Sequence, residues 1–175
     1  MKNQKSKKAF TMIELVFVIV IIGILASVAI PRLAATRDDA EITKARTVLS
    51  AVRNSLSMER QKRILRGEFD QITEVGDDTN VFGNFYTGSG ASSVDTGVSV
   101  LEYPMISELK KYRWARWNGN SGVWHMFCLN EPCTNDANSV WFHVQGGKFE
   151  CIDQGYATEN HGKCSILGIT GTSRK

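Results

Sequence analysis

The sequence contains few histidines and none of the residue spacings that are typical of an enzyme active site. Its three histidines, His125, His143 and His161, are too far apart to form an H-E-x-x-H zinc motif. Neither a G-x-S-x-G nucleophile motif nor a phosphate-binding P-loop occurs. The histidines are therefore expected on strand faces or in loops, and the chain is not expected to be an enzyme.

The spacings of common metal sites are also missing. The cysteines are spaced C-x4-C and C-x12-C, without the paired C-x2-C geometry of zinc ribbons. Asp77-Asp78-Thr79-Asn80 and Asn135-Asp136-Ala137-Asn138 could donate oxygens to calcium, but neither has EF-hand spacing. Both segments are interpreted as turn-forming loops, and no metal or other cofactor is expected.

An excess of one charge is confined to the N-terminus. Without Lys2, Lys5, Lys7 and Lys8, 17 basic side chains remain against 18 acidic ones, so the net charge gives no indication of nucleic-acid binding. A local cluster of cations and rings could contact DNA. The simpler interpretation is a strand with its charges in solvent and its rings in the core. The cluster comprises Lys110, Lys111, Tyr112, Arg113, Trp114, Arg116 and Trp117.

Behind the lysines lies a long apolar run. No residue from Leu15 to Ile30 is charged. With Phe10–Ile13 and Leu33–Ala35, the apolar stretch reaches the ~20 residues that span a bilayer of ~30 Å at ~1.5 Å per residue. The lysines place the N-terminus on the cytoplasmic side, so the rest of the chain is expected outside the cytoplasm.

Glu14 is unusual at the start of such a run, because a carboxylate at the centre of a membrane helix costs roughly 2.5–3.5 kcal/mol. It could lie at headgroup depth, where the cost is smaller. Alternatively, a cut between Ala9 and Phe10 would create an ammonium one helical turn upstream. That ammonium could pair with Glu14 of the same chain or of a neighbouring subunit.

The segment Ala9-Phe10-Thr11-Met12-Ile13-Glu14-Leu15 resembles the class III signal of type IV pilins and type II secretion pseudopilins. The resemblance covers about the first 60 residues. It implies that prepilin peptidase cuts between Ala9 and Phe10, that Phe10 is N-methylated, and that Glu14 neutralises the amine of an adjacent subunit. Gly23 and Pro31 stand where the family tends to have Gly and Pro. Ala9 departs from the family's usual Gly but is also small enough for a tight peptidase pocket.

Three functions follow from these observations. The first is a pseudopilin of a type II secretion or related DNA-uptake system, and the second is a major or minor pilin of an adhesive or motility pilus. The third is a soluble exported binding domain, released if signal peptidase cuts after Ser27-Val28-Ala29. The expected partners of a filament subunit are homologous pilin-like subunits, prepilin peptidase, the inner membrane, and a secreted protein or DNA as cargo. Its expected location is the inner membrane, single-pass with a periplasmic head, and then a periplasmic or surface filament.

The expected fold is α+β, with a long N-terminal helix packed on a small antiparallel sheet. Ile42, Ala45, Leu49, Val52 and Leu56 form one apolar stripe at helical spacing. Pro31 either separates two helices or kinks one helix from about Thr11 to Arg66, and Gly67 is a plausible helix stop. Gly23 is either a weak point or a site of close helix packing. The expected parts are a leader (1–9), a transmembrane or filament-core helix (10–35), an amphipathic helix (36–66) and a globular head (67–175).

Within the head, residues 68–100 are interpreted as an irregular loop with at most short strands near Val81–Tyr86 and Val98–Leu101. A short helix is predicted at Ser107–Lys111. The basic residues Arg60–Arg63 and Arg66 are interpreted as a solvated end of the long helix or as a subunit contact. Two hairpins follow, Tyr112–Trp117 with Val123–Cys128 and Val140–Gln145 with Lys148–Ile152. Their aromatic residues Trp114, Trp124, Trp141, Phe142 and Phe149 are expected to pack onto the helix stripe.

Four cysteines, Cys128, Cys133, Cys151 and Cys164, lie in the part of the chain expected outside the cytoplasm. Oxidation is the default there. Four cysteines allow three pairings. Loop shortness favours Cys128 with Cys133 and Cys151 with Cys164.

Overall fold

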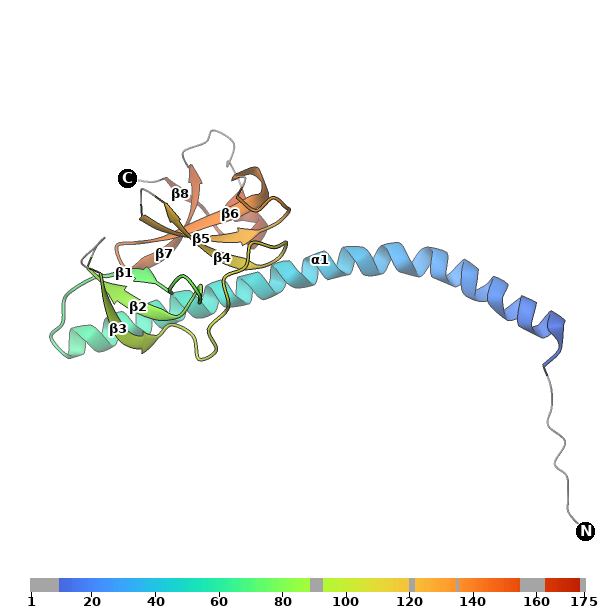
Figure 1. The fold of residues 1–175 in the computed structure, drawn as a ribbon, viewed down its shortest axis with the longest axis horizontal. Coiled ribbons are helices and arrows are strands. Elements are labelled where there is room, and N and C mark those ends of the chain that lie inside the picture. Colours follow the sequence, from blue (N-terminus) through green and yellow to red (C-terminus); the bar gives the residue numbers. More distant parts are fainter. Residues whose placement is uncertain (1–9, 89–92, 120–121, 135, 155–162, 174–175) are drawn as a thin grey trace, which may run out of the picture. The chain divides into compact units, whose positions relative to one another are not determined.

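The structure is a computed structural model that describes residues 10–88, 93–119, 122–134, 136–154 and 163–173 (Figure 1). The predicted leader, Ala9 included, lies outside the described residues. The chain divides into two compact units, Met1–Ala40 and Glu41–Lys175, and each is described by itself. The fold is α+β, as predicted: a long helix and antiparallel sheets.

Helix α1 (Met12–Leu65) is helical at every residue through Pro31, so of the two interpretations of this proline the single helix is confirmed. Its C-terminal end is a Schellman motif. The Glu68 N–H donates to the Arg63 carbonyl at 2.9 Å and the Gly67 N–H donates to the Ile64 carbonyl at 3.0 Å. Gly67 has a φ of 80°, which explains why glycine ends the helix here.

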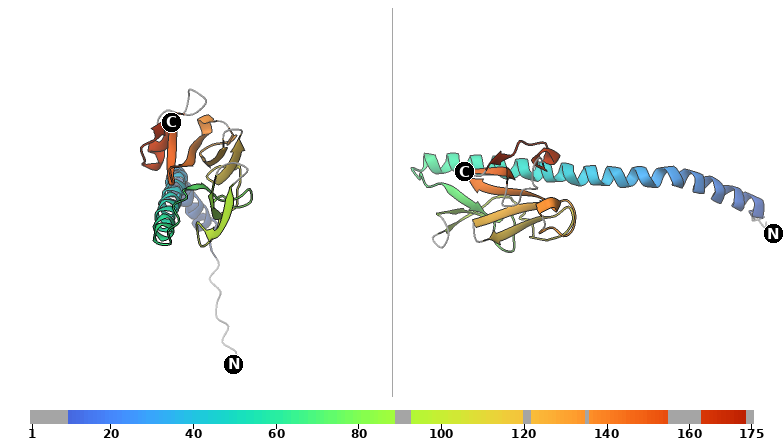
Figure 2. Two further views of the ribbon diagram at one scale, coloured as in Figure 1. Left: turned by 90° about the vertical axis from the view of Figure 1, so that its left-hand side faces the viewer. Right: turned by 90° about the horizontal axis from the view of Figure 1, so that it is seen from above.

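The head is built on the predicted stripe of α1. Ala45, Leu49, Val52 and Leu56 are buried and Ile42 is partly buried, in one cluster with residues from both sheets. Figure 2 shows the sheets beside the part of α1 that belongs to the head. Beside the stripe, Arg53 donates from Nε to the Phe149 carbonyl at 3.0 Å. The helix is therefore held by burial and also by polar contacts at its flanks.

The first sheet lies in the segment interpreted as an irregular loop. Its strands are β1 (Ile72–Val75), β2 (Asn84–Thr87) and β3 (Val94–Ser99), antiparallel in the order β1-β2-β3. Strands β2 and β3 overlap the short strands predicted near Val81–Tyr86 and Val98–Leu101, whereas β1 and the pairing into a sheet were not predicted. The strands are short and their register is irregular in both pairs, which is why no alternating pattern was visible. Gly76 has a φ of 76°, and a Cβ there would collide with the Val81 carbonyl.

The second sheet contains both predicted hairpins. Its strands, in order, are β4 (Trp114–Gly119), β5 (Gly122–Cys128), β6 (Ser139–Gln145), β7 (Lys148–Gln154) and β8 (Thr172–Ser173). The first four are antiparallel, and β8 pairs in parallel with β7. Two short 3-10 helices, η2 (Asp136–Asn138) and η3 (Lys163–Leu167), complete the described elements. Gly146 and Gly147 both have positive φ, as a two-residue turn between β6 and β7 requires.

The helix predicted at Ser107–Lys111 is absent from the structure. The Ser107 N–H donates to the Thr79 carbonyl at 2.9 Å, and the Glu108 N–H donates to the Trp114 carbonyl at 3.1 Å. Ile106 forms an isolated bridge with Asn80. Pairing with distant segments thus replaces the helical hydrogen bonds that the local pattern suggested.

The aromatic core differs in part from the prediction. Trp114, Phe142 and Phe149 are buried in the cluster that contains the helix stripe, as expected. Trp141 instead packs on the opposite sheet face, in a second cluster with Met126 and the Cys128–Cys133 disulfide. Successive residues of a strand point to opposite faces of the sheet. Phe127 on β5 and Phe142 on β6 face the helix side together with Trp114, and Trp124 and Trp141 are an odd number of positions away from them on the same strands. Both tryptophans therefore face the other side.

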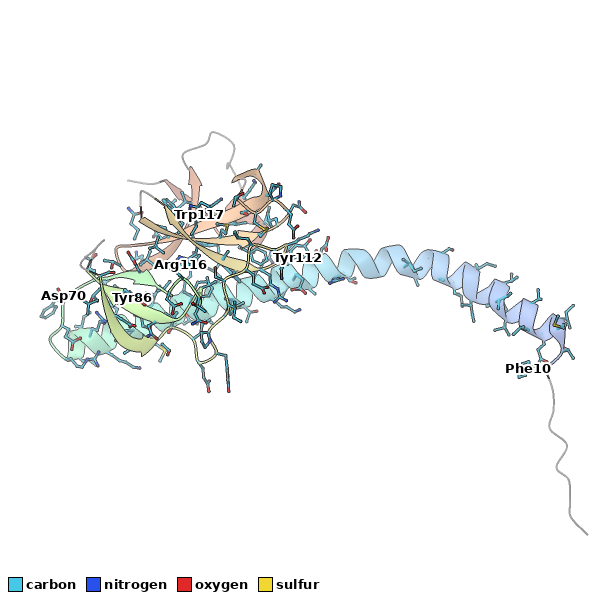
Figure 3. The ribbon with its side chains drawn as sticks, viewed as in Figure 1. Phe10, Asp70, Tyr86, Tyr112, Arg116 and Trp117 are labelled. Carbon is cyan, nitrogen blue, oxygen red and sulfur yellow. A yellow bond between two sulfur atoms is a disulfide. The ribbon has the colours of Figure 1, made fainter. Side chains whose placement is uncertain are left out.

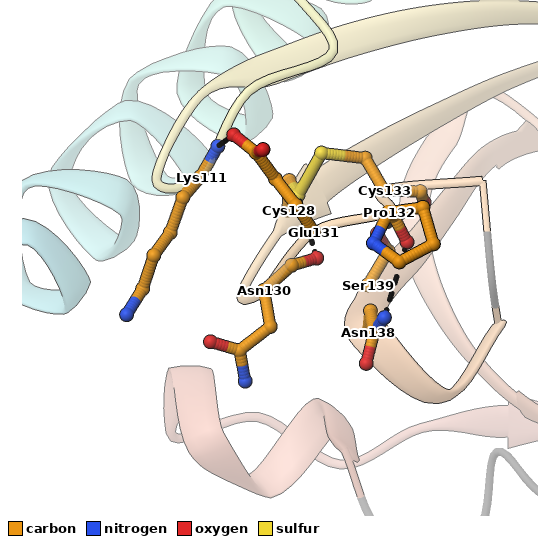
Figure 4. Close-up of a disulfide and its surroundings, with 8 residues drawn as sticks. All are labelled: Lys111, Cys128, Asn130, Glu131, Pro132, Cys133, Asn138 and Ser139. Atoms are coloured by element: carbon orange, nitrogen blue, oxygen red, sulfur yellow. Dashed lines mark hydrogen bonds between the residues drawn. A yellow bond between two sulfur atoms is a disulfide. The ribbon is translucent and has the colours of Figure 1, made fainter.

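Both favoured disulfides are present: Cys128–Cys133 and Cys151–Cys164. Figure 4 shows the first and the turn that it closes. The Ser139 hydroxyl donates to the Cys133 carbonyl at 2.6 Å, and the Asn138 side-chain amide donates to the Pro132 carbonyl at 3.1 Å. These bonds hold the turn against the start of β6.

Candidate assembly site

The first turn of α1 is capped by Thr11. The Glu14 N–H donates to the Thr11 carbonyl at 3.1 Å and approaches Thr11 Oγ1 at 3.4 Å, while the Leu15 N–H donates to the same carbonyl at 3.2 Å. This is the N-cap half of a capping box, in which a threonine is followed three residues later by a glutamate. Glu14 therefore lies in the first turn, near the positive end of the helix dipole.

From the sequence, Glu14 was assigned a role through its charge, and its place in the capped first turn was not predicted. The signal was present in the sequence, because T-x-x-E directly before an apolar run is the pattern of a capping box. Among the described residues, Glu14 has no ion-pair partner. Its charge is thus offset by the helix end, and it remains available to a cation from outside the described chain.

The helix that follows exposes a long apolar surface. Met12–Ile30, with 19 residues, is the one segment of the described chain that is long and apolar enough to cross a membrane. Phe10, labelled in Figure 3, precedes the cap and is 76% exposed. A continuous apolar surface of this size needs lipid or other apolar helices as its surroundings.

Gly23 and Pro31 both lie inside α1. Among the described residues, no atom lies within 4 Å of the position that a Cβ on Gly23 would take. Pro31 lacks the N–H of a helix interior, yet the helix continues past it. The residues that the structure describes therefore place no packing constraint on Gly23.

In the head, the candidate metal and calcium sites are not assembled. Within the part of the chain that the structure describes, no group of three or more His, Cys, Asp or Glu residues could hold a metal ion. Asp77 Oδ1 accepts the N–H groups of Thr79 at 2.8 Å and Asn80 at 2.7 Å, as in an Asx turn. These amides, that of Asn80 first, lower the pKa of Asp77. Of the second segment, Asn135 lies outside the described residues, and Asn138 binds the Pro132 carbonyl.

The cluster of cations and rings does not form one exposed surface. Arg116 is mostly buried and pairs with Asp78 and with Glu74 at 3.7 Å, so the prediction that its charge lies in solvent was wrong. Lys110 and Arg113 approach Glu108 at 3.8 and 3.7 Å. Trp114 is buried and Trp117 is 41% exposed; Figure 3 labels Tyr112, Arg116 and Trp117. The arrangement does not support a nucleic-acid interface.

The basic end of α1 is not simply solvated, which corrects the first interpretation of Arg60–Arg63 and Arg66. Arg63 is buried, and its Nε lies 3.3 Å from Oε1 of Glu59, which is also buried. Arg66 approaches the same oxygen at 3.2 Å. Positions 59 and 63 continue the spacing of the apolar stripe from Leu56, so the helix face that packs on the sheets includes an ion pair.

His125 makes the stability of the head depend on pH. The ring is buried between Phe82 and Phe149, and Nε2 lies 2.9 Å from the Val75 carbonyl. Burial lowers the pKa of His125 from 6.5 to about 4. The neutral ring therefore stabilises the fold fully above pH 6.5, and this stability is lost as the pH falls towards 4 because the unfolded chain binds the proton first.

We expect the free energy of unfolding of the head to fall by about 3 kcal/mol between pH 7 and pH 4 through this histidine alone. Glutamine can keep the bond to the Val75 carbonyl but does not titrate, so His125→Gln should show a shallower acid dependence. The measurement is denaturant unfolding followed by tryptophan fluorescence at several pH values. Equal slopes for the two proteins would show that His125 does not titrate as described.

Comparison with known proteins finds a family match in the N-terminal segment. The family model of the prokaryotic N-terminal methylation motif matches residues 4–30. This chain carries a prepilin-type methylation motif. The motif includes the residues on both sides of the predicted cut, the capped first turn of α1 and the exposed apolar run.

Two curated relatives are similar to this chain over a longer stretch than the methylation motif. It is 40% identical over 58 residues to type II secretion system core protein G of Vibrio cholerae serotype O1 (strain ATCC 39315 / El Tor Inaba N16961). It is 38% identical over 58 residues to the protein of the same name from Escherichia coli strain K12. Each match covers 33% of this chain and 40% of the relative's length. No solved structure shows a significant match.

Proposed function

We propose that this chain is a non-enzymatic structural subunit of a type IV pilus-like filament, a pseudopilin that serves a type II secretion or related DNA-uptake machine. The methylation motif at residues 4–30 is the observation that carries the proposal. The similarity to two type II secretion core proteins G supports a secretion subunit over a pilin of an adhesive or motility pilus.

In this proposal the apolar part of α1 first anchors the chain in the inner membrane, with the head in the periplasm. Prepilin peptidase then cuts between Ala9 and Phe10, and the new amine at Phe10 is methylated. On assembly the helix leaves the lipid and packs among the same helices of other subunits. This sequence of steps accounts for an apolar surface that has no partner within the described chain.

Glu14 is proposed to balance the amine of Phe10 of an adjacent subunit in the filament. The capped first turn fixes the direction of the helix start, and the carboxylate follows the amine by four residues. A subunit that docks at the wrong height leaves both charges unpaired in apolar surroundings, which costs several kcal/mol. The pair would therefore select one axial stagger between subunits.

The mass of the mature N-terminus tests the proposal. We expect a chain that begins with methylated Phe10, because the proposal requires cleavage after Ala9 and retention of the apolar helix. Intact mass and N-terminal peptide mass of the protein purified from membranes measure this. A mature chain that begins at Ile30, as ordinary signal peptidase would produce, would show that the helix is discarded and that no filament can form.

A further inference from the structure

One face of the five-stranded sheet carries a row of rings that runs across the strands. Trp117 of β4 lies directly opposite Trp124 of β5. The register of β5 and β6 places Trp124 opposite His143, and His143 pairs with Glu150 of β7. Opposite residues of antiparallel strands point to the same face, so these four side chains form one line, the ring row. At ~4.8 Å between neighbouring strands, the ring row is ~14 Å long.

The ring row lies on the face of the sheet that points away from the helix. Phe127 of β5 packs with the helix stripe, so Trp124, an odd number of positions away, faces the opposite side together with the rest of the row. Trp117, labelled in Figure 3, is 41% exposed, and the other three members are partly exposed. A ligand in solution can therefore reach the row.

On one side of the ring row the face is covered by protein. Met126 and Trp141 are the neighbouring outward-facing pair of β5 and β6. They pack with the Cys128–Cys133 disulfide in a small apolar cluster. The turn that this disulfide closes thus bounds the row on this side.

On its other side the ring row is lined by glycines and polar residues. Strands β4 and β5 contribute Gly119 and Gly122, which pair with each other and carry no side chains. Strands β6 and β7 contribute Gln145 and Lys148, which also pair, and Lys148 is exposed. An amide and an ammonium group therefore lie beside the rings, and the Glu150 carboxylate lies at the end of the row.

The chemistry of these groups fits a neutral saccharide. Lys148 and Glu150 balance each other, so the row lacks the excess positive charge that binds phosphates or nucleic acid. A lipid or an apolar protein surface would desolvate Gln145, Lys148 and Glu150 without offering them partners. A sugar ring packs its C–H groups on an indole, and its hydroxyls bond to amide, ammonium and carboxylate groups.

We propose that the outer face of the five-stranded sheet binds a short, extended, neutral oligosaccharide. One sugar packs on Trp117, and the chain runs across the strands towards Glu150. Trp124 and His143, whose ring centroids are 5.2 Å apart, form the middle of the site. Gln145 donates to sugar hydroxyls from the open side. This binding site does not depend on how the chain assembles, so it goes beyond the proposed function.

Calorimetric titration of the full-length chain, in a detergent without a sugar headgroup, tests the site with cellotetraose and with N-acetylated chitotetraose. We expect saturable binding of at least one of them, weakened about tenfold by Trp117→Ala because one aromatic contact is lost. Trp117→Phe keeps a ring and should retain most of the affinity. The matched control, Tyr103→Ala, removes an aromatic residue that is 80% exposed outside the ring row and should leave the affinity unchanged.

The two oligosaccharides also distinguish the source of the ligand. Tighter binding of chitotetraose indicates a glycan with acetamido groups, and equal binding indicates recognition through ring and hydroxyls alone. Thermal unfolding of each variant shows whether the fold is kept. Absence of binding up to about 10 mM of either compound, or equal affinity of Trp117→Ala and the unmodified chain, would overturn the inference. A filament map with Trp117 buried between two heads would also overturn it and leave the proposed function standing.

Discussion

Filaments assembled from the Glu14→Ala variant are expected to fall by two orders of magnitude or more, while membrane insertion is unchanged. In the proposed filament Glu14 balances the amine of Phe10 in apolar surroundings, and removal of one member of a buried ion pair costs about 3–5 kcal/mol. A loss of this size at every subunit interface corresponds to at least a hundredfold change in the association constant. Filament yield after shearing, against total membrane-bound subunit, measures the effect.

Two variants separate the charge of Glu14 from its place in the capped first turn. Glu14→Gln keeps the shape and should assemble as poorly as Glu14→Ala. Thr11→Ala removes the hydroxyl that caps the helix, at a cost of about 1 kcal/mol, and should assemble nearly normally. Normal filament yield from Glu14→Gln would mean that the carboxylate is needed for local helix structure and not for charge balance.

The Arg63→Leu variant is expected to lose about 3–5 kcal/mol of head stability, the second large effect. Glu59 and Arg63 are both buried, so the change leaves a carboxylate in the packed face of α1 with only the half-exposed Arg66 nearby. Urea unfolding of the full-length chain in detergent, followed by tryptophan fluorescence, measures the loss. All four tryptophans lie in the head, which makes this signal specific.

The matched controls for Arg63 follow from the same geometry. Arg66→Ala should cost at most about 1 kcal/mol, because an ion pair with an exposed partner contributes little. The double variant Glu59→Leu/Arg63→Leu should be more stable than Arg63→Leu alone, since no buried carboxylate then depends on the half-exposed Arg66 as its one cationic partner among the described residues. Equal stability of Arg63→Leu and the unmodified chain would show that the buried pair does not contribute to the fold.

Periodic and local signals in the sequence predicted their parts of the fold. The stripe from Ala45 to Leu56 fixed the packed face of α1, because residues three and four apart share one side of a helix. Gly67 and the Gly146-Gly147 turn were found from residues that tolerate positive φ. The disulfides were predicted from loop length, because each cysteine was paired with its neighbour in the sequence, Cys128 with Cys133 and Cys151 with Cys164.

Features that depend on distant contacts were missed. Strand β1 was not predicted and β2 and β3 were predicted only approximately, because strands of four to six residues with irregular register are too short for a two-residue period to be seen. Ser107 and Glu108 were assigned to a helix from the local residue pattern. Their N–H groups instead donate to the carbonyls of Thr79 and Trp114, which a local pattern does not reveal. Arg63 was interpreted from its charge as part of a solvated helix end or a subunit contact, although its spacing continues the apolar stripe and it is buried beside Glu59.

The assembly roles of the candidate site residues stay predictions, and the structure describes only the local geometry around them. Phe10, Glu14, Gly23 and Pro31 were selected by resemblance, and the structure adds that Thr11 caps the helix at Glu14. The partner of Glu14 could not be found from one chain, because the proposed contact joins two subunits.

The most direct test of the central claim is the distance between the Phe10 amine nitrogen and the Glu14 carboxylate of a neighbouring subunit, measured in a filament map that resolves side chains. If Glu14 balances the amine, we expect an ion pair in which the amine nitrogen and a carboxylate oxygen lie within about 4 Å and neighbouring apolar helices shield the carboxylate from solvent. A Glu14 that lies in contact with water, with no amine of another subunit within reach, would contradict it.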